Sequence, residues 1–359
     1  MEINMQKYLF LYENKENDQK ESNHAGSKAP SDIITIAEKI GFKPIYIKKD
    51  SKSKGFINRI KRAIRSYKCW AKSVKNMQTN SVVLIQYPIY QNDVFRNYFL
   101  HKIKNKKHIR IISLVHDVEQ IRNNNIKEYY DNEFETMLRL SDIIIVHNNN
   151  MLQWFKNQGV NEEKLVNIQI FDYLQTTYNA ARPKFKQSIT IAGNLDVKKA
   201  TYIEELSKLH NVDINLYGPN YSGYTTKIEN IHYHGSFPPN EIPNKLTEGF
   251  GLVWDGTSIE TCAGLTGQYL KYNNPHKLSL FLSSGLPVVI WSHAAEADFV
   301  KKNGVGICVD SLYNLESVLS RIQESDYYEL ADHAAAIGQN LRAGAYTTRA
   351  LEEACKKLI

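Results

Sequence analysis

Residues that suit the binding of a phosphate are concentrated between Trp254 and Lys277. An apolar run ends at Trp254, a polar loop follows, and Asn274-Pro275 is typical of a helix start with asparagine as N-cap, for a helix that ends at Gly285. The first N–H groups of a helix and its positive dipole end attract anions. Three cationic side chains flank this start: Lys271, His276 and Lys277. The segment is therefore either a diphosphate site or an ordinary capped helix beside surface lysines.

Two glycine turns follow apolar runs in the same half of the chain. Gly193-Asn194 ends the first run, where a glycine lets the backbone approach a ligand closely. Tyr217 ends the second run before Gly218, and its ring offers a flat apolar wall for a nucleotide base. Such turns are common and aromatic residues are more often part of a core, so each turn taken alone is a weak signal.

In the first half, His116 and Asp117 follow the strongly apolar run Ile109–Val115. Side chains at the carboxyl end of a parallel strand lie where ligands bind, and a carboxylate or imidazole there suits a base that deprotonates an attacking hydroxyl. We favour Asp117 because a carboxylate is ionised at neutral pH. The alternative is a helix N-cap aspartate beside a hydrogen-bonded histidine.

A second candidate contact lies nearer the N-terminus. Residues 23–30 are predicted to form a loop before a helix whose N-cap is Ser31. Gly26 and the small residues around it permit tight contact with a ligand, and Lys28 adds a cation. A loop without any ligand is the equal alternative.

Short apolar, β-branched runs alternate with longer helical patterns along the whole chain. The first half is predicted to have strands 7–12, 44–47, 82–86, 109–115, 142–146 and 165–170, with helices near 31–40, 56–75, 93–104, 127–140 and 151–157. The second half is predicted to have strands 188–192, 213–217, 231–233, 251–254, 287–291 and 306–309, with helices near 201–209, 239–247, 275–284, 294–302 and 312–323, and a helical tail over 326–359. This alternation is typical of parallel sheets with crossover helices.

The polar segment 172–187 separates the two halves and is predicted to be a linker. We therefore expect an α/β fold of two doubly wound, Rossmann-like domains, residues 1–180 and 181–359, that face an interdomain cleft. Neither half has Gly-x-Gly-x-x-Gly after its first strand, and no Gly-x-x-x-x-Gly-Lys-Ser/Thr motif occurs. Dehydrogenases and P-loop NTPases are therefore disfavoured.

The net charge of +7 is unevenly distributed over the 359 residues. Residues 48–110 contain 17 Lys and Arg but only two Asp, a local charge of +15, so the rest of the chain has −8. Within this region the predicted helix 56–75 is amphipathic. The stretch Lys48–Lys75 is interpreted either as a contact with a membrane surface or acidic partner, or as a solvated helix face. Nucleic acid is disfavoured because no recognised binding motif accompanies the charge.

The cysteines and the hydropathy pattern bear on the compartment. Four cysteines are scattered without a Cys-x-x-Cys pair, which disfavours a zinc site or a disulfide framework and favours a reducing cytoplasm. No apolar run is long enough to span a bilayer, and no secretory signal is visible at the N-terminus. We expect a cytoplasmic protein that associates with membrane if the basic stretch binds it.

Taken in order, several of these segments form one pattern. It comprises Asn23, Ala25-Gly26, Lys28-Ala29 and Asp32, then His116-Asp117, Ala192-Gly193, Gly251–Trp254 and Tyr269-x-Lys-x-Asn-x-Pro-His-Lys277. This order resembles bacterial GT-B glycosyltransferases of the glucosyltransferase 3 type, which extend glycans on serine-rich adhesins, and related β-1,6-galactofuranosyltransferases. The resemblance covers nearly the whole chain and is most specific at Lys271-x-Asn273-x-x-His276-Lys277.

The resemblance implies a UDP-sugar donor bound mainly by the second domain, transfer without a metal or other cofactor, and a homo-oligomer, a dimer or tetramer. The candidate substrate-binding residues are Gly26, Lys28, Gly193, Asn194, Tyr217, Lys271, Asn273, Asn274, His276 and Lys277. The candidate catalytic residues are Asp117 and His116. The chain departs from the family in its basic stretch and in a long loop predicted at 254–268.

The favoured function is an inverting, metal-independent glycosyltransferase that moves a hexose from a UDP-sugar to a sugar acceptor on a glycoprotein glycan. Glucose is the favoured hexose. One alternative is a galactofuranosyltransferase of capsule or exopolysaccharide synthesis. Another is a non-catalytic partner subunit of a glycosyltransferase, which the full set of donor-site cations argues against. A third is a nucleotide-sugar epimerase, which would need no separate acceptor site.

Overall fold

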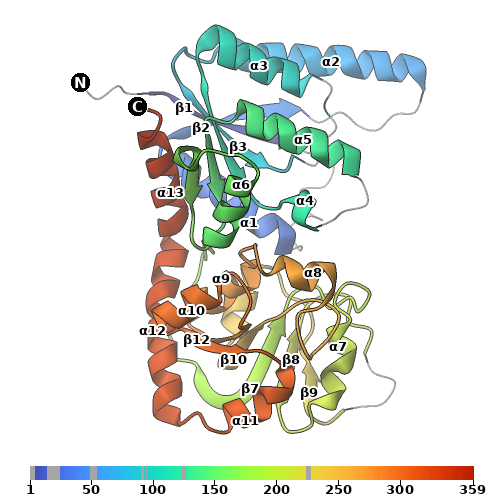
Figure 1. Ribbon diagram of the computed structural model, residues 1–359, viewed down its shortest axis with the longest axis vertical. Coiled ribbons are helices and arrows are strands. Elements are labelled where there is room, and N and C mark those ends of the chain that lie inside the picture. Colours follow the sequence, from blue (N-terminus) through green and yellow to red (C-terminus); the bar gives the residue numbers. More distant parts are fainter. Residues whose placement is uncertain are drawn as a thin grey trace.

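The computed structural model describes residues 5–13, 25–48, 55–89, 93, 95–122, 127–223 and 228–359. Within these ranges the strands form two six-stranded sheets in which every neighbouring pair is parallel (Figure 1). The central strands are short and mostly apolar, as expected when helices cover both faces of a parallel sheet: Val82–Tyr87, Arg110–Val115, Ile143–Val146, Glu248–Val253 and Val288–Trp291. All four residues of Ile143–Val146 and of Val288–Trp291 are buried.

The first sheet has the order β2-β1-β3-β4-β5-β6. Its strands are β1 (Lys7–Glu13), β2 (Phe42–Lys48), β3 (Val82–Tyr87), β4 (Arg110–Val115), β5 (Ile143–Val146) and β6 (Leu165–Asn167). The helices between them are α1 (Ala25–Lys39), α2 (Phe56–Lys75), α3 (Arg96–Lys107), α4 (Glu119–Arg122), α5 (Lys127–Leu140) and α6 (Asn149–Asn157), with a 3-10 turn at Glu162–Lys164.

The second sheet has the order β12-β11-β10-β7-β8-β9. Its strands are β7 (Lys184–Ala192), β8 (Asp213–Tyr217), β9 (Ile231–Tyr233), β10 (Glu248–Val253), β11 (Val288–Trp291) and β12 (Gly306–Val309). The helices of this part are α7 (Tyr202–Glu205), α8 (Gly264–Tyr269), α9 (His276–Ser283), α10 (Ala297–Asn303), α11 (Leu315–Leu319), α12 (Glu324–Ala343) and α13 (Ala345–Lys356). Short 3-10 turns lie at Leu206–Lys208, Ile242–Lys245 and Leu312–Asn314.

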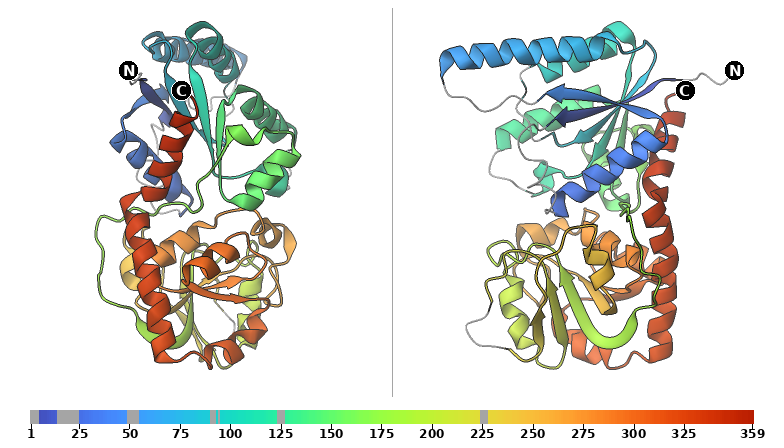
Figure 2. Two further views of the ribbon diagram at one scale, coloured as in Figure 1. Left: turned by 60° about the vertical axis from the view of Figure 1, so that its left-hand side comes forward. Right: turned by 180° about the vertical axis from the view of Figure 1, so that it is seen from behind.

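The end of the chain returns to the first sheet. Helix α12 packs on α9 of the second domain, the chain turns at Gly344, and α13 packs on α1 and β5 (Figure 2). Gly344 has a φ of +76°, and a Cβ there would lie 2.7 Å from Ile36 Cγ1, so only glycine suits this turn. The Lys357 ammonium donates to the Leu165 carbonyl at 2.9 Å. The division of the chain at residue 180 stays a prediction, and α13 contacts the first sheet.

The predicted strands are present, whereas several helix and loop boundaries were wrong. Helix α1 begins at Ala25, not after a loop ending at Pro30, and the Lys28–Asp32 ion pair at 2.6 Å joins the turns on either side of that proline. Residues 23 and 24 lie outside the described residues. The predicted loop 254–268 contains the start of α8. The helices predicted at 239–247 and 312–323 are much shorter.

The predicted linker 172–187 is also shorter than expected. Strand β7 begins at Lys184, and Asp172 is buried. The Asp172 carboxylate accepts the backbone N–H groups of Tyr346 and Thr347 at 3.3 and 2.6 Å, in the first turn of α13. This anion at a helix N-terminus attaches the interdomain segment to the last helix.

None of the helices among the described residues has both the length and the apolar composition needed to cross a bilayer. None of the four cysteines, all of which lie within the described residues, forms a disulfide bond.

Candidate active site

Each sheet has one point at which the order of strand addition reverses. It lies between β1 and β3 in the first sheet and between β7 and β10 in the second. In open α/β sheets, ligands bind beyond the carboxyl ends of the strands at this point, because the connections leave there in opposite directions and open a crevice. The topology therefore indicates two ligand sites, one in each domain.

A pocket of about 710 Å³ lies at the reversal point of the first sheet. Its walls come from the ends of β1, β3 and β4, from the first turns of α1, and from the second-domain residues 273–276. The polar side chains of this wall include Gln86, His116, Asp117 and Asn273. The pocket is thus formed by both domains, with a largely apolar floor and a few polar groups at one side, which is the usual make-up of a small-molecule site.

His116 and Asp117 follow β4, and both line the pocket. The His116 Nε2–H donates to the Gln86 Oε1 at 2.6 Å, and burial lowers the pKa of His116 to about 3, helped by the nearby His147 and His276. This imidazole is therefore neutral at pH 7 and a weak base. The Asp117 side chain is one-third exposed and forms an ion pair with Arg122 at 3.1 Å.

Tyr269 of α8 reaches across the domain junction to the segment that follows β4. Its hydroxyl accepts the backbone N–H of Val118 at 2.9 Å, and its ring lies 5.7 Å from the Arg122 guanidinium. Burial and the neighbouring Asp117 raise the pKa of Tyr269, so the hydroxyl stays protonated and contacts that carboxylate. A second-domain side chain therefore holds Asp117 in its position.

Asn274 connects the domains rather than capping the helix. Helix α9 has Pro275 at its N-cap with no side-chain cap bond, so the prediction of an asparagine cap was wrong. The Asn274 Nδ2 donates to the carbonyls of His147 and Gln169 at 2.7 and 3.0 Å, and its Oδ1 accepts the Asn148 Nδ2 at 2.7 Å. The helix ends as predicted, with Gly285 at a φ of +76°.

His147 completes this junction. Its Nε2–H donates to the Val115 carbonyl at 3.0 Å, and its Nδ1 accepts the backbone N–H of Asn274 at 2.9 Å. That pair of bonds requires the neutral imidazole with the proton on Nε2. Burial lowers the pKa of His147 to about 4, which agrees with this state.

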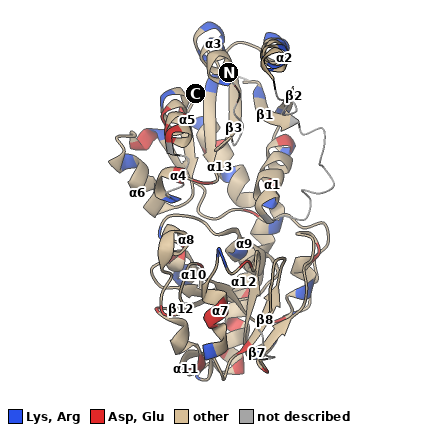
Figure 3. Ribbon diagram, turned by 90° about the vertical axis from the view of Figure 1, so that its right-hand side faces the viewer, with Lys and Arg blue, Asp and Glu red and all other residues tan. Residues whose placement is uncertain are grey.

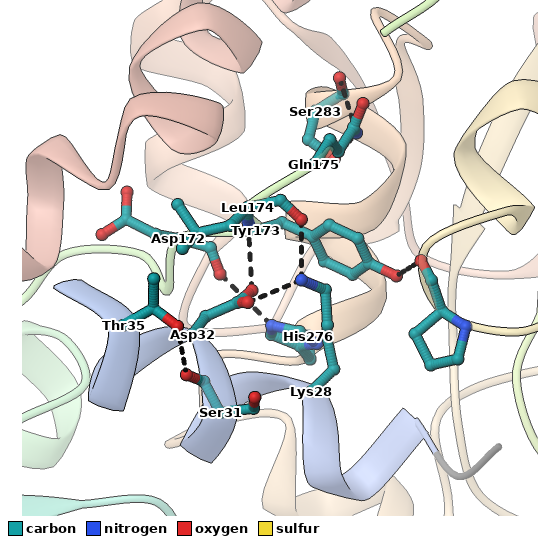
Figure 4. A network of polar contacts seen from close by, with 11 residues as sticks. Lys28, Ser31, Asp32, Thr35, Asp172, Tyr173, Leu174, Gln175, His276 and Ser283 are labelled. Atoms are coloured by element: carbon teal, nitrogen blue, oxygen red, sulfur yellow. Dashed lines mark hydrogen bonds and ion pairs between the residues drawn. The ribbon is translucent and has the colours of Figure 1, made fainter. Parts of the chain in front are cut away.

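A second polar network joins α1 to the interdomain segment (Figure 4). The Lys28 ammonium donates to Asp32 Oδ1 and to the Leu174 carbonyl, both at 2.6 Å, and Asp32 Oδ2 accepts the Leu174 N–H at 2.9 Å. Lys28 is therefore bonded within the protein and does not line the pocket, whereas Gly26 does. The expectation that Lys28 contacts substrate loses its geometric support.

His276 belongs to the same region (Figure 4). Its ring stacks on Tyr173 with centroids 5.0 Å apart, and its Nε2–H donates to the Asp172 carbonyl at 3.3 Å. Burial lowers the pKa of His276 to about 4. A cationic donor at this position loses its support, because desolvation and the nearby Lys28 ammonium favour the neutral imidazole.

In the second domain, two glycine turns lie at neighbouring strand ends. The Gly193 N–H donates to the Tyr217 carbonyl at 3.0 Å, and a Cβ on Gly218 would lie 1.7 Å from the Gly193 oxygen. This backbone contact requires glycine at 218. The Tyr217 ring stacks on His234 at 4.6 Å, and Asn194 Oδ1 accepts the Asn220 Nδ2 at 2.9 Å.

Lys277 in the first turn of α9 and Lys271 before that helix have different surroundings. Lys277 donates to the Trp254 carbonyl at 2.7 Å and lies 3.6 Å from Asp255, at the end of β10. Lys271 lies 5.7 Å above the Trp291 ring. The Asn273 Oδ1 is buried and has no hydrogen-bond partner within the described chain, although it borders the pocket.

The sequence was compared with family models and known proteins. Residues 12–170 match the glucosyltransferase 3-like N-terminal domain, and residues 189–354 match the glucosyltransferase 3-like C-terminal domain. The chain belongs to the glucosyltransferase 3-like family. It is 30% identical to the β-1,6-galactofuranosyltransferase WbbI of Escherichia coli K12, over 92% of this chain and 94% of the relative. It is 22% identical to glucosyltransferase 3 of Streptococcus gordonii, over 77% of this chain and 80% of that protein.

The fold of this glucosyltransferase 3-like chain also resembles solved structures. Anabaena HepE, solved in complex with UDP and glucose, aligns over 98% of this chain and 99% of its own with a TM-score of 0.58 and 12% identity. Together with the two parallel sheets, this likeness confirms the predicted two-domain GT-B fold. The resemblance to the family inferred from the sequence motifs is confirmed as well.

Sequence reasoning on this glucosyltransferase 3-like chain missed the residues that join its domains. Tyr269 lies within the motif 269–277, but its contact with the first domain was not predicted, and neither were the contacts of His147, Asn148 and Arg122 with the second domain. One signal was available, since the polar run His147–Asn150 directly follows the buried strand β5. Among the described residues, no three His, Cys, Asp or Glu side chains are grouped so that they could hold a metal ion.

Proposed function

We propose that this chain transfers a hexose from a UDP-sugar to a hydroxyl of a sugar acceptor on a glycoprotein glycan. Glucose is the favoured hexose. The observation that supports this most directly is the pocket of about 710 Å³ at the reversal point of the first sheet, which borders residues 273–276 of the second domain. That arrangement suits two substrates bound on opposite sides of one cleft. The names of the relatives WbbI and glucosyltransferase 3, both sugar transferases, support the same reaction class.

In this proposal Asp117 is the general base. It takes the proton of the acceptor hydroxyl, whose oxygen forms a bond to the anomeric carbon of the donor, while the bond from that carbon to the UDP oxygen breaks and UDP leaves with the electron pair. Attack from the face opposite UDP inverts the anomeric centre. His116 is the weaker candidate, because its Nε2–H is bonded to Gln86 and its pKa is lowered to about 3.

The UDP moiety is proposed to lie at the carboxyl edge of the second sheet. The backbone of Gly193 and Asn194 would approach the diphosphate. The Tyr217 ring, at the end of the neighbouring strand β8, would face the uracil base of UDP. Lys277 and Lys271 would supply positive charge near the start of α9. Asn273, which lines the pocket, would contact the sugar, whereas Asn274 acts by holding the domains together.

We further propose that the transfer needs no metal ion or other cofactor, and that Lys271, Lys277 and the dipole of α9 would stabilise the charge of the leaving diphosphate instead. Activity is then retained in EDTA. Loss of activity in chelator that manganese restores would contradict this part of the proposal.

The experiment that tests the function is a donor screen with the purified full chain. UDP-glucose, UDP-galactose, UDP-N-acetylglucosamine, UDP-galactofuranose and GDP-mannose are compared by thermal shift and by release of radiolabelled sugar. A ligand at a hundredfold its Kd stabilises the folded state by about 2.7 kcal/mol, so the true donor gives the largest shift. A chain that neither shifts nor hydrolyses any UDP-sugar would contradict the proposal and favour the non-catalytic partner subunit.

A second candidate keeps the reaction and changes the donor. UDP-galactofuranose in capsule or exopolysaccharide synthesis is favoured by the 30% identity to the galactofuranosyltransferase WbbI. In the same screen this candidate predicts that the largest shift comes from UDP-galactofuranose. An interconversion of free UDP-sugars without an acceptor would instead indicate an epimerase.

We also propose a compartment, an oligomeric state and a membrane contact for the chain. The chain would act in the cytoplasm as a homo-oligomer, a dimer or tetramer, with peripheral membrane contact through residues 48–75 and without nucleic acid. Of this stretch, residues 49–54 lie outside the described residues. Light scattering of the purified chain measures the oligomer, and a monomer over the whole concentration range would contradict that part.

A further inference from the structure

The N-terminal half of α2 exposes a row of large apolar side chains. Phe56 and Ile57 are 77% and 68% exposed, and Ile60 and Ile64 are 45% and 50% exposed. Spacings of three and four residues put these side chains on one side of the helix. In Figures 1 and 2 this half of α2 extends beyond the rest of the first domain. No described element covers the row, although burying it would be favourable.

The other half of α2 is firmly attached, so the projection is not a loosely placed segment. Trp70 is buried, stacks on Phe99 with centroids 5.8 Å apart, and donates from its Nε1 to Asp93 at 2.6 Å. The Lys107 ammonium donates to the carbonyls of Val74, Lys75 and Met77, which lie at the C-terminal end of the helix. These bonds satisfy carbonyls that a helix end leaves free and fix the direction of α2.

The charge of α2 has one sign. The helix has seven cationic side chains and no Asp or Glu: Arg59, Lys61, Arg62, Arg65, Lys68, Lys72 and Lys75. At 100° per residue, Lys61, Lys68 and Lys72 lie along one border of the apolar row. Figure 3 shows blue on α2 and on the neighbouring α3 at the end of the first domain. An apolar stripe bordered by lysines is the pattern of a helix that lies in a membrane interface.

We propose that this face of α2 binds the surface of an anionic lipid bilayer, with Phe56, Ile57, Ile60 and Ile64 entering the headgroup and acyl boundary and the lysines contacting lipid phosphates. The inference rests on the membrane contact proposed above and specifies its face and its chemistry. A symmetric contact between two copies would bring the same cationic helix against itself, and that repulsion opposes a dimer through this face. A purely phosphate-binding surface would not need the isoleucines.

The attached half of α2 adjoins the pocket. Ser73 Oγ donates to the carbonyl of Tyr46 at 3.2 Å, and Tyr46 lines the pocket. The Trp70 ring lies 6.5 Å from that of Tyr12, another pocket residue. Helix α2 therefore connects the proposed lipid-binding face at its N-terminal half to the wall of the pocket at its attached half.

The test uses the full chain and flotation with vesicles of phosphatidylcholine alone or mixed with phosphatidylglycerol. We expect the protein to float with the mixed vesicles and to remain at the bottom with phosphatidylcholine. An Ile57→Trp variant adds a reporter, whose emission moves to shorter wavelength when the indole enters the bilayer. Protein that stays at the bottom with the anionic vesicles at low salt would overturn the proposal.

Two pairs of variants separate the contributions. Ile60→Gln with Ile64→Gln removes apolar surface and should weaken partitioning about tenfold or more, whereas Tyr313→Gln, an equally exposed position in the second domain, should leave it unchanged. Lys61→Gln with Lys68→Gln should weaken it about fivefold per charge, with an effect that high salt reduces. The control Lys301→Gln with Lys302→Gln, on α10, should have no effect.

Three results would contradict the proposal in distinct ways. Loss of binding in the lysine variant with none in the isoleucine variant, and no emission shift, would indicate a surface that binds anions without insertion. A concentration-dependent dimer that the isoleucine variant abolishes would assign the row to a second copy. Equal loss in the α10 control would indicate nonspecific charge. The donor screen is independent of all three, since every position varied lies outside the proposed catalytic and substrate sites.

Discussion

The carboxyl edges of the two sheets differ in the space and in the hydrogen-bonded groups that they present. In the first domain, the strand ends surround an open pocket of about 710 Å³ with a largely apolar floor and the Asp117 carboxylate at its side. In the second, the strand ends are joined by backbone contacts such as Gly193 N–H to the Tyr217 carbonyl, and the nearby Lys277 is bonded to the Trp254 carbonyl. The edge of the first sheet thus has an open pocket, whereas the edge of the second sheet has backbone groups and a lysine that are held in place by hydrogen bonds.

The two edges also differ in which residues their geometry depends on. At the second-domain edge, Gly218 packs so closely on the Gly193 oxygen that no side chain fits at position 218. At the first-domain edge, Asp117 depends on Arg122 and on Tyr269, a residue of the other domain. The proposed base is therefore in contact with a side chain of the second domain, and from this contact we infer that the two edges are coupled through the junction.

The largest loss of turnover is expected from a change to the proposed general base of the first domain. Asp117→Asn should lower turnover by about 10²–10⁴-fold while UDP affinity is unchanged, because a general base acts in the transition state and not on the bound donor. Steady-state kinetics and calorimetry with UDP measure the two quantities. The exposed Asp298→Asn is the control. Near-normal turnover in Asp117→Asn would assign the base to His116 or to another residue.

The converse pattern is expected in the second domain. Lys277→Ala should weaken UDP binding by about 1.5–3 kcal/mol, the usual worth of a hydrogen bond to a charged group. Calorimetry measures the loss, and Lys302→Ala is the control on an exposed lysine of the same domain. Unchanged UDP affinity would mean that Lys277 serves only its bond to the Trp254 carbonyl, and the phosphate site would have to lie elsewhere.

Tyr269→Phe tests whether the two edges are coupled. The change removes the hydroxyl that accepts the Val118 N–H, and we expect about a tenfold loss of turnover with little change in UDP affinity. Tyr327→Phe is a matched control, because its buried hydroxyl makes one bond, to the Gly249 carbonyl at 2.9 Å, away from the pocket. If both variants lose stability and turnover equally, Tyr269 has a structural role and does not position Asp117.

The smallest effect concerns the junction and its dependence on pH. The pKa of His147 is lowered to about 4 in the folded chain, so its contribution to the free energy of unfolding is fully present above pH 6.5 and is lost as the pH falls toward 4. His147→Gln should therefore be less stable than the wild type at pH 7.5, and the difference should narrow at pH 5. Urea unfolding at the two pH values measures it. A constant difference would contradict a neutral His147.

Much of the fold could be predicted because the strands are buried on both faces. Runs such as Ile143–Val146 are apolar over their whole length, and the helical patterns between such runs are typical of parallel strands joined by crossover helices. The errors lie where local pattern is a poor guide. Helix α1 begins before Pro30 because Lys28 and Asp32 form an ion pair across that turn, and both bond to Leu174, a contact distant in the sequence.

The site divides in the same way. Local sequence was enough to predict that His116 and Asp117 follow a strand, that glycine turns lie at positions 193 and 218, and that α2 is a basic amphipathic helix, since each depends on neighbouring residues alone. Contacts between distant parts of the chain were needed to show that Asn274 joins the domains instead of capping α9, that the pKa of His276 is lowered, and that Tyr269 contacts Asp117. The reason is physical: burial, charge state and hydrogen-bond partners are set by residues that are far apart in the chain and meet only when both domains are folded.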